Sequence, residues 1–294
     1  MFNRENKAMC EMNFEPQGKG GKSMSILITG ATGKLGSLII EQLLKRVERE
    51  RLIACVHRLD KAIQLRELGI EVRQADYDDP LSLERSFAGG SKLLFISSPH
   101  TDDTVRVRQH SHVIEAAKKA NITHLVYTSF AFLEKANISL THLHLATEHA
   151  IRTTGIPYTF LRNGLYSDVI AAFGIQQAIE TGELITYPGK WSFHTVTRED
   201  LSLAAATVIS TEGHENQTYE LTASRAWNFV ELAEVLAART GKSIRHREDP
   251  VAESWLYHFL MQIDASSTTT DLERIIGKPT ASLEQMVRQI MEQA

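Results

Sequence analysis

An α/β fold with a doubly wound parallel sheet is the class that the sequence predicts. From Ser25 onward, short β-branched runs alternate with longer helical patterns, and a glycine-rich stretch follows the first strand directly. Parallel strands need crossover connections, so this alternation is typical of a parallel sheet with helices on both faces. An apolar fraction of 43% with 23% charged residues fits an ordinary globular protein.

Six strands and five helices are predicted before the last third of the chain. The strands are short runs rich in apolar and β-branched residues, at 26–29, 52–56, 70–73, 93–97, 125–128 and 158–161. The helices repeat apolar residues at helical spacing, at 38–47, 62–68, 81–87, 105–120 and 140–154. No internal repeat or long linker divides the series. One nucleotide-binding domain is therefore expected over 24–294.

The first 23 residues differ in composition from the rest. They are polar, contain Gly18, Gly20 and Gly21, and lack the apolar core of a signal peptide. This composition predicts a disordered leader over 1–23, with Met24 as a natural start and a binding arm as the alternative.

The C-terminal third predicts small helices that cap the strand ends. The segment 229–239 is amphipathic and stops at Gly241, a residue typical of helix C-termini. The segments 270–273 and 282–285 match capping boxes, which begin helices. A small, mostly helical substrate-capping part is therefore expected, formed mainly by 164–192 and 223–294, where a doubly wound sheet binds its ligand.

The glycine-rich turn predicts a dinucleotide-binding site of the Rossmann type. It combines a tight turn, backbone that a pyrophosphate can approach, and a helix N-terminus that attracts phosphate. A glycine motif alone is weak, but the strand–turn–helix context makes it specific. The expected cofactor contacts in this turn are Gly30, Thr32, Gly33, Lys34, Leu35 and Gly36.

The residues after the second strand predict NADPH as the cofactor. Arg58 stands where an acidic residue would bind the ribose of NAD, and its planar guanidinium suits a 2′-phosphate. Lys34 adds a second cation nearby. Asp60 favours NAD weakly, although it comes slightly late in the sequence. The alternative is that Arg58 is a solvated loop residue.

Polar side chains at later strand ends extend the predicted cofactor site. Asp76 follows the third strand and is expected at the adenine edge. Ser97 and Ser98 end the fourth strand, and Thr128 and Ser129 end the fifth, so both pairs face one crevice. Simple capping of the strand ends is the alternative for these hydroxyl groups.

Several stretches taken together resemble the NmrA-like branch of the atypical short-chain dehydrogenases, and within it the triphenylmethane reductase and NADPH-quinone oxidoreductase group. They lie at 28–36, 92–98, 142–148, 155–164 and 196–198. The resemblance implies an NADPH-bound Rossmann domain that delivers hydride to flat, conjugated acceptors such as quinones or cationic dyes. Two departures stand out: 249–271 looks shorter than in those relatives, and Lys34 replaces their usual glutamine.

One helix is expected to carry the catalytic groups. Short-chain dehydrogenases that act on alcohols need a Tyr-x-x-x-Lys pair there, and this chain has His144 and Glu148 instead, on one helix face. Related isoflavone-reductase-like proteins place a lysine at the position of His144. With an ordinary pKa near 6.5, His144 would protonate the acceptor or orient the cofactor, and Glu148 would hold its tautomer. The alternative is that His144 only forms hydrogen bonds along its helix face.

The remaining site residues are expected around the acceptor. Asn163 ends the sixth strand beside the cofactor, and Tyr166 follows it. Phe130, Phe132 and Trp191 are candidates to stack on a planar acceptor, with ordinary core packing as the alternative. Hydride transfer to such acceptors needs no protein acid, so positioning alone is a sufficient mechanism.

Other function classes are disfavoured. A net charge of −4 gives no basic footprint for nucleic acid or anionic lipid. No apolar run approaches the roughly 20 residues that span a bilayer. The two cysteines, Cys10 and Cys55, have no metal-ligand or redox spacing, which fits a reducing, cytoplasmic setting and no bound metal. A monomer or homodimer is expected. The alternatives are a non-catalytic NADP(H) sensor of the NmrA type and, with the missing tyrosine against it, a sugar-nucleotide epimerase.

Overall fold

The computed structural model describes residues 24–293, and the predicted leader 1–23 lies outside the described residues. A seven-stranded sheet forms its centre, and every neighbouring pair of strands is parallel. The strand order is β3-β2-β1-β4-β5-β6-β8. The strands are β1 (Ile26–Thr29), β2 (Leu52–Val56), β3 (Glu71–Gln74), β4 (Lys92–Phe95), β5 (His124–Phe130), β6 (Tyr158–Asn163) and β8 (Gln217–Leu221). The order reverses between β1 and β4, which places the ligand crevice of such a sheet at the end of β1.

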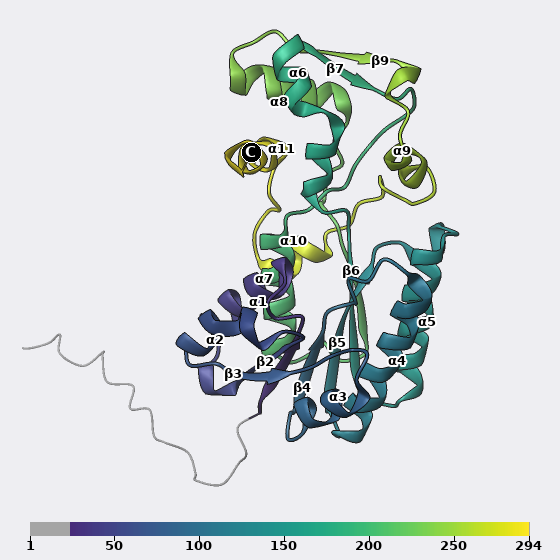
Figure 1. Cartoon of the computed structure of the whole chain (residues 1–294). Coiled ribbons are helices and arrows are strands. Elements are labelled where there is room, and N and C mark those ends of the chain that lie inside the picture. Colours follow the sequence, from purple (N-terminus) through teal and green to yellow (C-terminus); the bar gives the residue numbers. More distant parts are fainter. Residues whose placement is uncertain (1–23, 294) are drawn as a thin grey trace, which may run out of the picture.

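Helices cover both faces of this sheet (Figure 1). On one face, around the first apolar cluster, lie α1 (Lys34–Leu43), α2 (Ile63–Glu67), α7 (Arg198–Ser210) and α10 (Asp271–Ile276). On the other lie α3 (Pro80–Phe87), α4 (Asp103–Lys119) and α5 (Ser139–Thr153). The predicted doubly wound class and all six predicted strands are confirmed, with ends that differ by a few residues. Strand β8 was missed because its residues Gln-Thr-Tyr-Glu-Leu show no apolar run.

A C-terminal lobe stands over the carboxyl ends of the strands (Figure 1). It comprises η4 (Ser167–Phe173), α6 (Ile175–Thr181), β7 (Glu183–Thr186), α8 (Phe229–Thr240), β9 (Arg245–Glu248), α9 (Trp255–Leu260) and α11 (Leu283–Gln293). Its own apolar core is aromatic, with Phe173, Phe193, Trp227 and Phe229 in mutual contact. Helices predominate as predicted, but β7 and β9 also pair as a two-stranded parallel sheet that the sequence analysis missed.

The helix starts in this lobe follow the predicted caps only in part. At Ser282 the capping box is confirmed, because its hydroxyl accepts from the Gln285 N–H and its own N–H donates to the Gln285 side chain. The box predicted at Thr270 is wrong, since that hydroxyl caps nothing and the Glu273 carboxylate accepts from the Ser224 hydroxyl instead. Among the described residues, no helix has both the length and the apolar character needed to cross a membrane.

Candidate cofactor and acceptor site

The glycine turn has the geometry of a phosphate cradle. Gly30 has φ +62°, a backbone conformation that L side chains rarely adopt, and its carbonyl accepts from the Gly33 N–H at 2.9 Å. A Cβ on Gly36 would lie 2.2 Å from that same carbonyl oxygen, so only glycine allows α1 to start this close to the turn. Gly33, the N-cap, supplies no side-chain cap. The first N–H groups of α1 are therefore available to the phosphates of a dinucleotide, which this turn fits.

The predicted 2′-phosphate site is at the end of β2. Arg58 is exposed there, and its guanidinium holds Asp60 through two bonds of 3.1 and 2.6 Å. Asp60 thus pairs with the guanidinium group that is expected to bind the 2′-phosphate. On the adjacent strand end, Asp76 lies 3.4 Å from the His57 ring and accepts from the Asp78 N–H. Asp76 therefore caps the loop after β3, whereas within residues 24–293 the Asp60 carboxylate binds only Arg58.

The hydroxyl groups at the ends of β4 and β5 are mostly used within the protein. Thr128 Oγ1 accepts from the Ser97 N–H at 2.9 Å, and Ser98 donates to the Gln109 side chain. Ser129 donates to Glu148 at 2.7 Å. These bonds are the ones that the strand-capping alternative requires. The Ser97 hydroxyl has no partner in the part of the chain that the structure describes.

His144 is a buried, neutral group. Its Nδ1 lies 2.7 Å from the Tyr127 hydroxyl, and the Phe130 ring stacks on it at 6.4 Å and 25°. Burial, and then the charges of Arg106 and His110, lower the pKa of His144 well below its ordinary value. The expectation of an ordinary imidazole pKa was therefore wrong, since the sequence alone does not show how deeply this helix face is buried.

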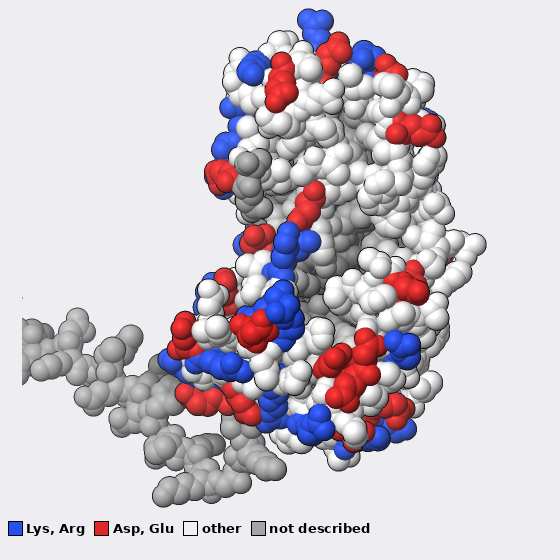
Figure 2. Space-filling model, in the orientation of Figure 1, with Lys and Arg blue, Asp and Glu red and all other residues white. Residues whose placement is uncertain are grey.

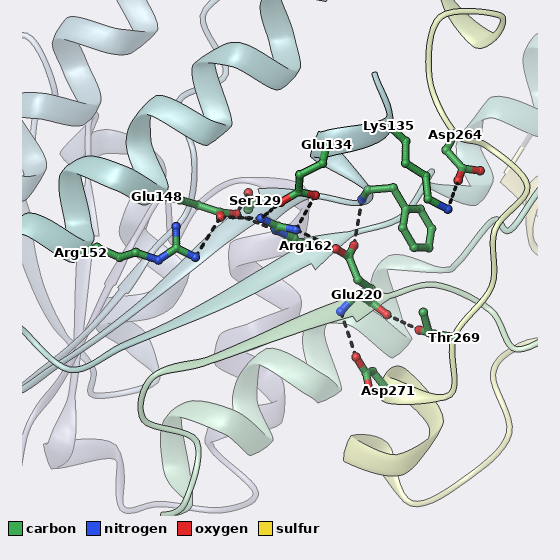
Figure 3. A network of polar contacts seen from close by, with 11 residues as sticks. Ser129, Glu134, Lys135, Glu148, Arg152, Arg162, Glu220, Asp264, Thr269 and Asp271 are labelled. Carbon is green, nitrogen blue, oxygen red and sulfur yellow. Dashed lines mark hydrogen bonds and ion pairs between the residues drawn. The ribbon is translucent and has the colours of Figure 1, made fainter. Parts of the chain in front are cut away.

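Glu148 forms no hydrogen bond with His144, so the predicted role as its tautomer anchor is wrong. The carboxylate is fully buried and accepts from Ser129 and from Arg162, whose Nε and Nη2 lie 2.9 and 2.8 Å away. Figure 3 shows Arg162 reaching across to Glu148 from the strand below the helix. The guanidinium on β6 captures the carboxylate because a fully buried charge needs an opposite charge at bonding distance.

Arg162 is the centre of a larger ionic cluster. It also bonds Glu134 at 2.8 and 3.0 Å and Glu220 at 2.9 Å. The second Glu220 oxygen accepts from the Phe132 N–H at 2.9 Å, and its backbone N–H donates to Asp271 at 3.1 Å (Figure 3). The cluster therefore joins β5, α5, β6 and β8 to the C-terminal segment. Sequence reasoning gave Arg162 no role, although a charged residue inside an apolar strand was the available signal.

The predicted acceptor residues separate into two groups. Asn163 donates to the Tyr166 hydroxyl at 3.3 Å, and the Arg198 guanidinium lies 4.5 Å from the Tyr166 ring centre. These residues and Phe130 lie at the carboxyl edge of the sheet. Trp191 instead stacks on Phe193 at 6.3 Å inside the core of the C-terminal lobe.

Phe132 fits neither prediction, as a residue that stacks on the acceptor or as an ordinary core residue. It adopts a left-handed conformation, with φ 51°, and packs against His194 at 5.6 Å. The Lys135 ammonium group lies 4.6 Å from its ring centre. These contacts place Phe132 at the junction of the two lobes.

A cavity of about 500 Å³ opens beside the glycine turn. It lies between the turn, η4, the start of α7 and α11, and its lining residues are Lys34, Leu38, Ser167, Asp168, Ala171, Arg198, Glu199, Gln289 and Ile290. Figure 2 shows the surface hollowed between the two lobes, with Lys and Arg side chains along one side. Arg198, which pairs with Asp168, is a site cation that the sequence analysis did not single out. No group of metal-ligating side chains occurs within residues 24–293.

Known proteins resemble this chain over nearly its whole length. It is 36% identical over 280 residues to quinone oxidoreductase 2 of Escherichia coli (strain K12), covering 89% of this chain and 97% of that protein. The NADP(H) complex of Citrobacter sp. triphenylmethane reductase matches with 44% identity and a TM-score of 0.84, covering 90% of this chain and 99% of that chain. The NADPH complex of the Escherichia coli NADPH-dependent quinone oxidoreductase matches with 36% identity and a TM-score of 0.81, at the same coverage. Residues 22–292 match the NmrA-like family, and the chain belongs to that family, as the resemblance predicted.

Proposed function

We propose that this protein is an NADPH-dependent reductase that delivers hydride to a flat, conjugated acceptor such as a quinone or a triphenylmethane dye. The main support is that α1 begins at Gly33 without a side-chain cap, at the point where the strand order reverses. An exposed Arg58 stands at the end of the neighbouring strand. Relatives named as an NADPH-dependent quinone oxidoreductase and a triphenylmethane reductase support this assignment.

Each part of the cofactor has residues to hold it in this proposal. The first turn of α1 holds the pyrophosphate, Arg58 the 2′-phosphate and Asp76 the adenine edge. Ser97, Ser98, Thr128, Ser129 and Asn163 line the crevice toward the nicotinamide. The reduced dinucleotide supplies a hydride, which carries two electrons and one proton, and water supplies the second proton that a quinone needs.

The acceptor is held between the lobes. In this proposal Phe130 and Tyr166 line the sheet side, and the half-buried Trp191, although it packs on Phe193, is the candidate from the C-terminal lobe. His144, which stacks with the Phe130 ring, is the titratable group that we place beside the acceptor. Glu148 supports this edge through Arg162 and takes no part in proton transfer.

The test is NADPH oxidation with a panel of quinones and triphenylmethane dyes, run beside NADH. Acceptor-dependent oxidation that prefers NADPH is expected. Tight NADPH binding without turnover of any acceptor would contradict the reductase and favour an NADP(H) sensor.

The cofactor assignment has its own test in Arg58→Glu. We expect this variant to weaken NADPH binding at least about tenfold more than NADH binding, because the 2′-phosphate loses its cation and meets a carboxylate. Arg66→Glu is the matched control, since Arg66 is an exposed arginine on the adjacent helix α2. Equal losses for both cofactors would contradict the 2′-phosphate site.

We further propose that the protein works in the cytoplasm as a monomer or homodimer, with a small planar acceptor as its partner and neither nucleic acid nor membrane. The net charge of −4 and the free, buried thiol of Cys55 support this setting. Light scattering after size-exclusion chromatography tests the oligomeric state.

A further inference from the structure

The protons on the histidines around Tyr127 are determined by their hydrogen bonds. The backbone N–H of Ser98 donates to His110 Nε2 at 2.9 Å, so that nitrogen carries no proton. Burial lowers the pKa of His110 to about 3, so the ring is neutral and its proton is on Nδ1. This Nδ1–H donates to Thr147 Oγ1 at 2.9 Å, and the Thr147 hydroxyl donates to the Leu143 carbonyl at 2.9 Å.

The Tyr127 hydroxyl must therefore donate to His144. The hydroxyl is fully buried, 2.7 Å from His144 Nδ1 and 3.5 Å from His110 Nδ1. His110 Nδ1 is already protonated and accepts nothing. If His144 Nδ1 were also protonated, the Tyr127 hydroxyl would lose this 2.7 Å acceptor, and its only other partner among the described residues would be the Thr147 hydroxyl, which already accepts from His110. His144 Nδ1 is thus the acceptor, and the proton of the His144 ring is on Nε2.

The protonated nitrogen of His144, Nε2, is the one that is free to bind a ligand. His144 Nε2 has no hydrogen-bond partner among residues 24–293, yet it is not one of the buried nitrogens sealed from solvent. The Phe130 ring that stacks on the imidazole belongs to the last residue of β5, at the edge beneath the C-terminal lobe. Arg106 and His110 face the imidazole from α4, and the nearest carboxylate on its own helix, Glu148, is bound to Arg162. The site therefore offers one neutral N–H donor toward the acceptor.

We propose that Tyr127 and His110 hold His144 as the neutral Nε2–H tautomer, and that this N–H binds the carbonyl oxygen of a quinone-type acceptor. The donor role rests on the function proposed above. The hydride adds to the quinone, the charge that develops on its carbonyl oxygen is stabilised by the His144 N–H, and water protonates that oxygen to give the hydroquinone. His144 keeps its proton throughout. A triphenylmethane cation accepts hydride at carbon and presents no carbonyl oxygen, so it gains nothing from this donor.

The tautomer is tested without turnover. In protein labelled with ¹⁵N-histidine and free of cofactor, long-range ¹H–¹⁵N spectra at pH 7 should show His144 with a bare Nδ1 and a protonated Nε2. Tyr127→Phe, which removes only the hydroxyl, should shift His144 toward a mixture of tautomers. A wild-type signal with the proton on Nδ1, or on both nitrogens, would overturn the proposal.

The donor role is tested by comparing two acceptors. His144→Leu should lower kcat/KM for a quinone by about a hundredfold or more, as loss of a transition-state donor does, and change that for a triphenylmethane dye by less than about threefold. His144→Gln retains an N–H donor and should recover most of the quinone activity. Equal losses for both acceptors would overturn the donor role. A wild-type protein that reduces neither acceptor would overturn the proposed function itself, while the spectra still decide the tautomer.

Discussion

His144 and Glu148 are buried side chains one turn apart on helix α5, and each belongs to a different network. His144 belongs to a neutral hydrogen-bond network with Ser98, His110, Tyr127 and Thr147. In this network the hydrogen bonds assign each proton to one donor atom. Glu148 joins the ionic cluster around Arg162. Four-residue spacing put both side chains on one helix face, but the strand beneath decided the partners. Tyr127 of β5 lies under His144, whereas Arg162 of the neighbouring β6 reaches Glu148.

The two networks differ in whether they are closed. Both Glu148 oxygens bind Arg162, and the side chain has no exposed surface. The neutral chain ends at His144 Nε2, which has no partner among the described residues. A closed ionic cluster stabilises an arrangement of elements, whereas an open donor can bind a ligand. The comparison thus separates a supporting group, Glu148, from the proposed ligand donor, His144, on a single helix.

Arg162→Met should have the largest effect, a loss of about 3–5 kcal/mol in the free energy of unfolding. The variant leaves the Glu148 charge buried without a partner, while the methionine fills most of the volume. Urea unfolding measures the loss. Glu134→Gln is the matched control, because that side chain is 61% exposed and its loss should stay below about 1 kcal/mol. Similar losses of unfolding free energy for the two variants would contradict the idea that burial of Glu148 makes its ion pair with Arg162 important for stability.

Acidification should destabilise the neutral network first. The pKa of His110 is about 3 in the folded chain and near 6.5 when unfolded, so protons bind the unfolded chain first as the pH falls. Stability from His110 is complete above about pH 6.5 and declines toward pH 3, by on the order of 2 kcal/mol at pH 5. Arg162 lowers the pKa of Glu134 despite partial burial, so that carboxylate contributes stability above about pH 4.5 and loses it at lower pH.

Urea unfolding between pH 7.5 and 5 measures this dependence. His110→Gln should bind up to one proton fewer on unfolding over the interval, because the glutamine does not titrate. An unchanged slope of stability against pH in His110→Gln would contradict the assignment of His110 as a neutral buried group.

A double-mutant cycle tests whether the two networks are independent. Ser129→Ala removes one donor to Glu148, and Tyr127→Phe removes the donor to His144, each at a cost of about 1 kcal/mol. Because these donors share no partner, their effects should add to within about 0.5 kcal/mol in thermal or urea unfolding. A larger coupling energy would show that the two networks act as one.

The exposed pair Arg58–Asp60 should show the smallest effect on stability. Asp60→Asn removes a salt bridge whose two side chains are 58% and 62% exposed, and the free energy of unfolding should change by less than about 0.5 kcal/mol. The same change frees Arg58 for the 2′-phosphate, so NADPH should bind more tightly while NADH is unaffected. Isothermal titration calorimetry with both cofactors checks this, and weaker NADPH binding would contradict the competition between Asp60 and the phosphate.

Local sequence patterns predicted six of the seven strands of the central sheet, the glycine turn and the cofactor class. Apolar runs, helical spacing and the glycines at 30, 33 and 36 are local patterns, and local patterns predict strands, helices and turns. Strands β8 and β9 were missed because their residues form no apolar run and pair with strands far away in the chain. Strand β7, Glu-Leu-Ile-Thr, has a short apolar run that the sequence analysis passed over. The roles of the polar side chains could not be predicted in this way. The pKa of His144, the partner of Glu148 and the centrality of Arg162 depend on burial and on side chains from adjacent strands, which spacing along one helix does not contain.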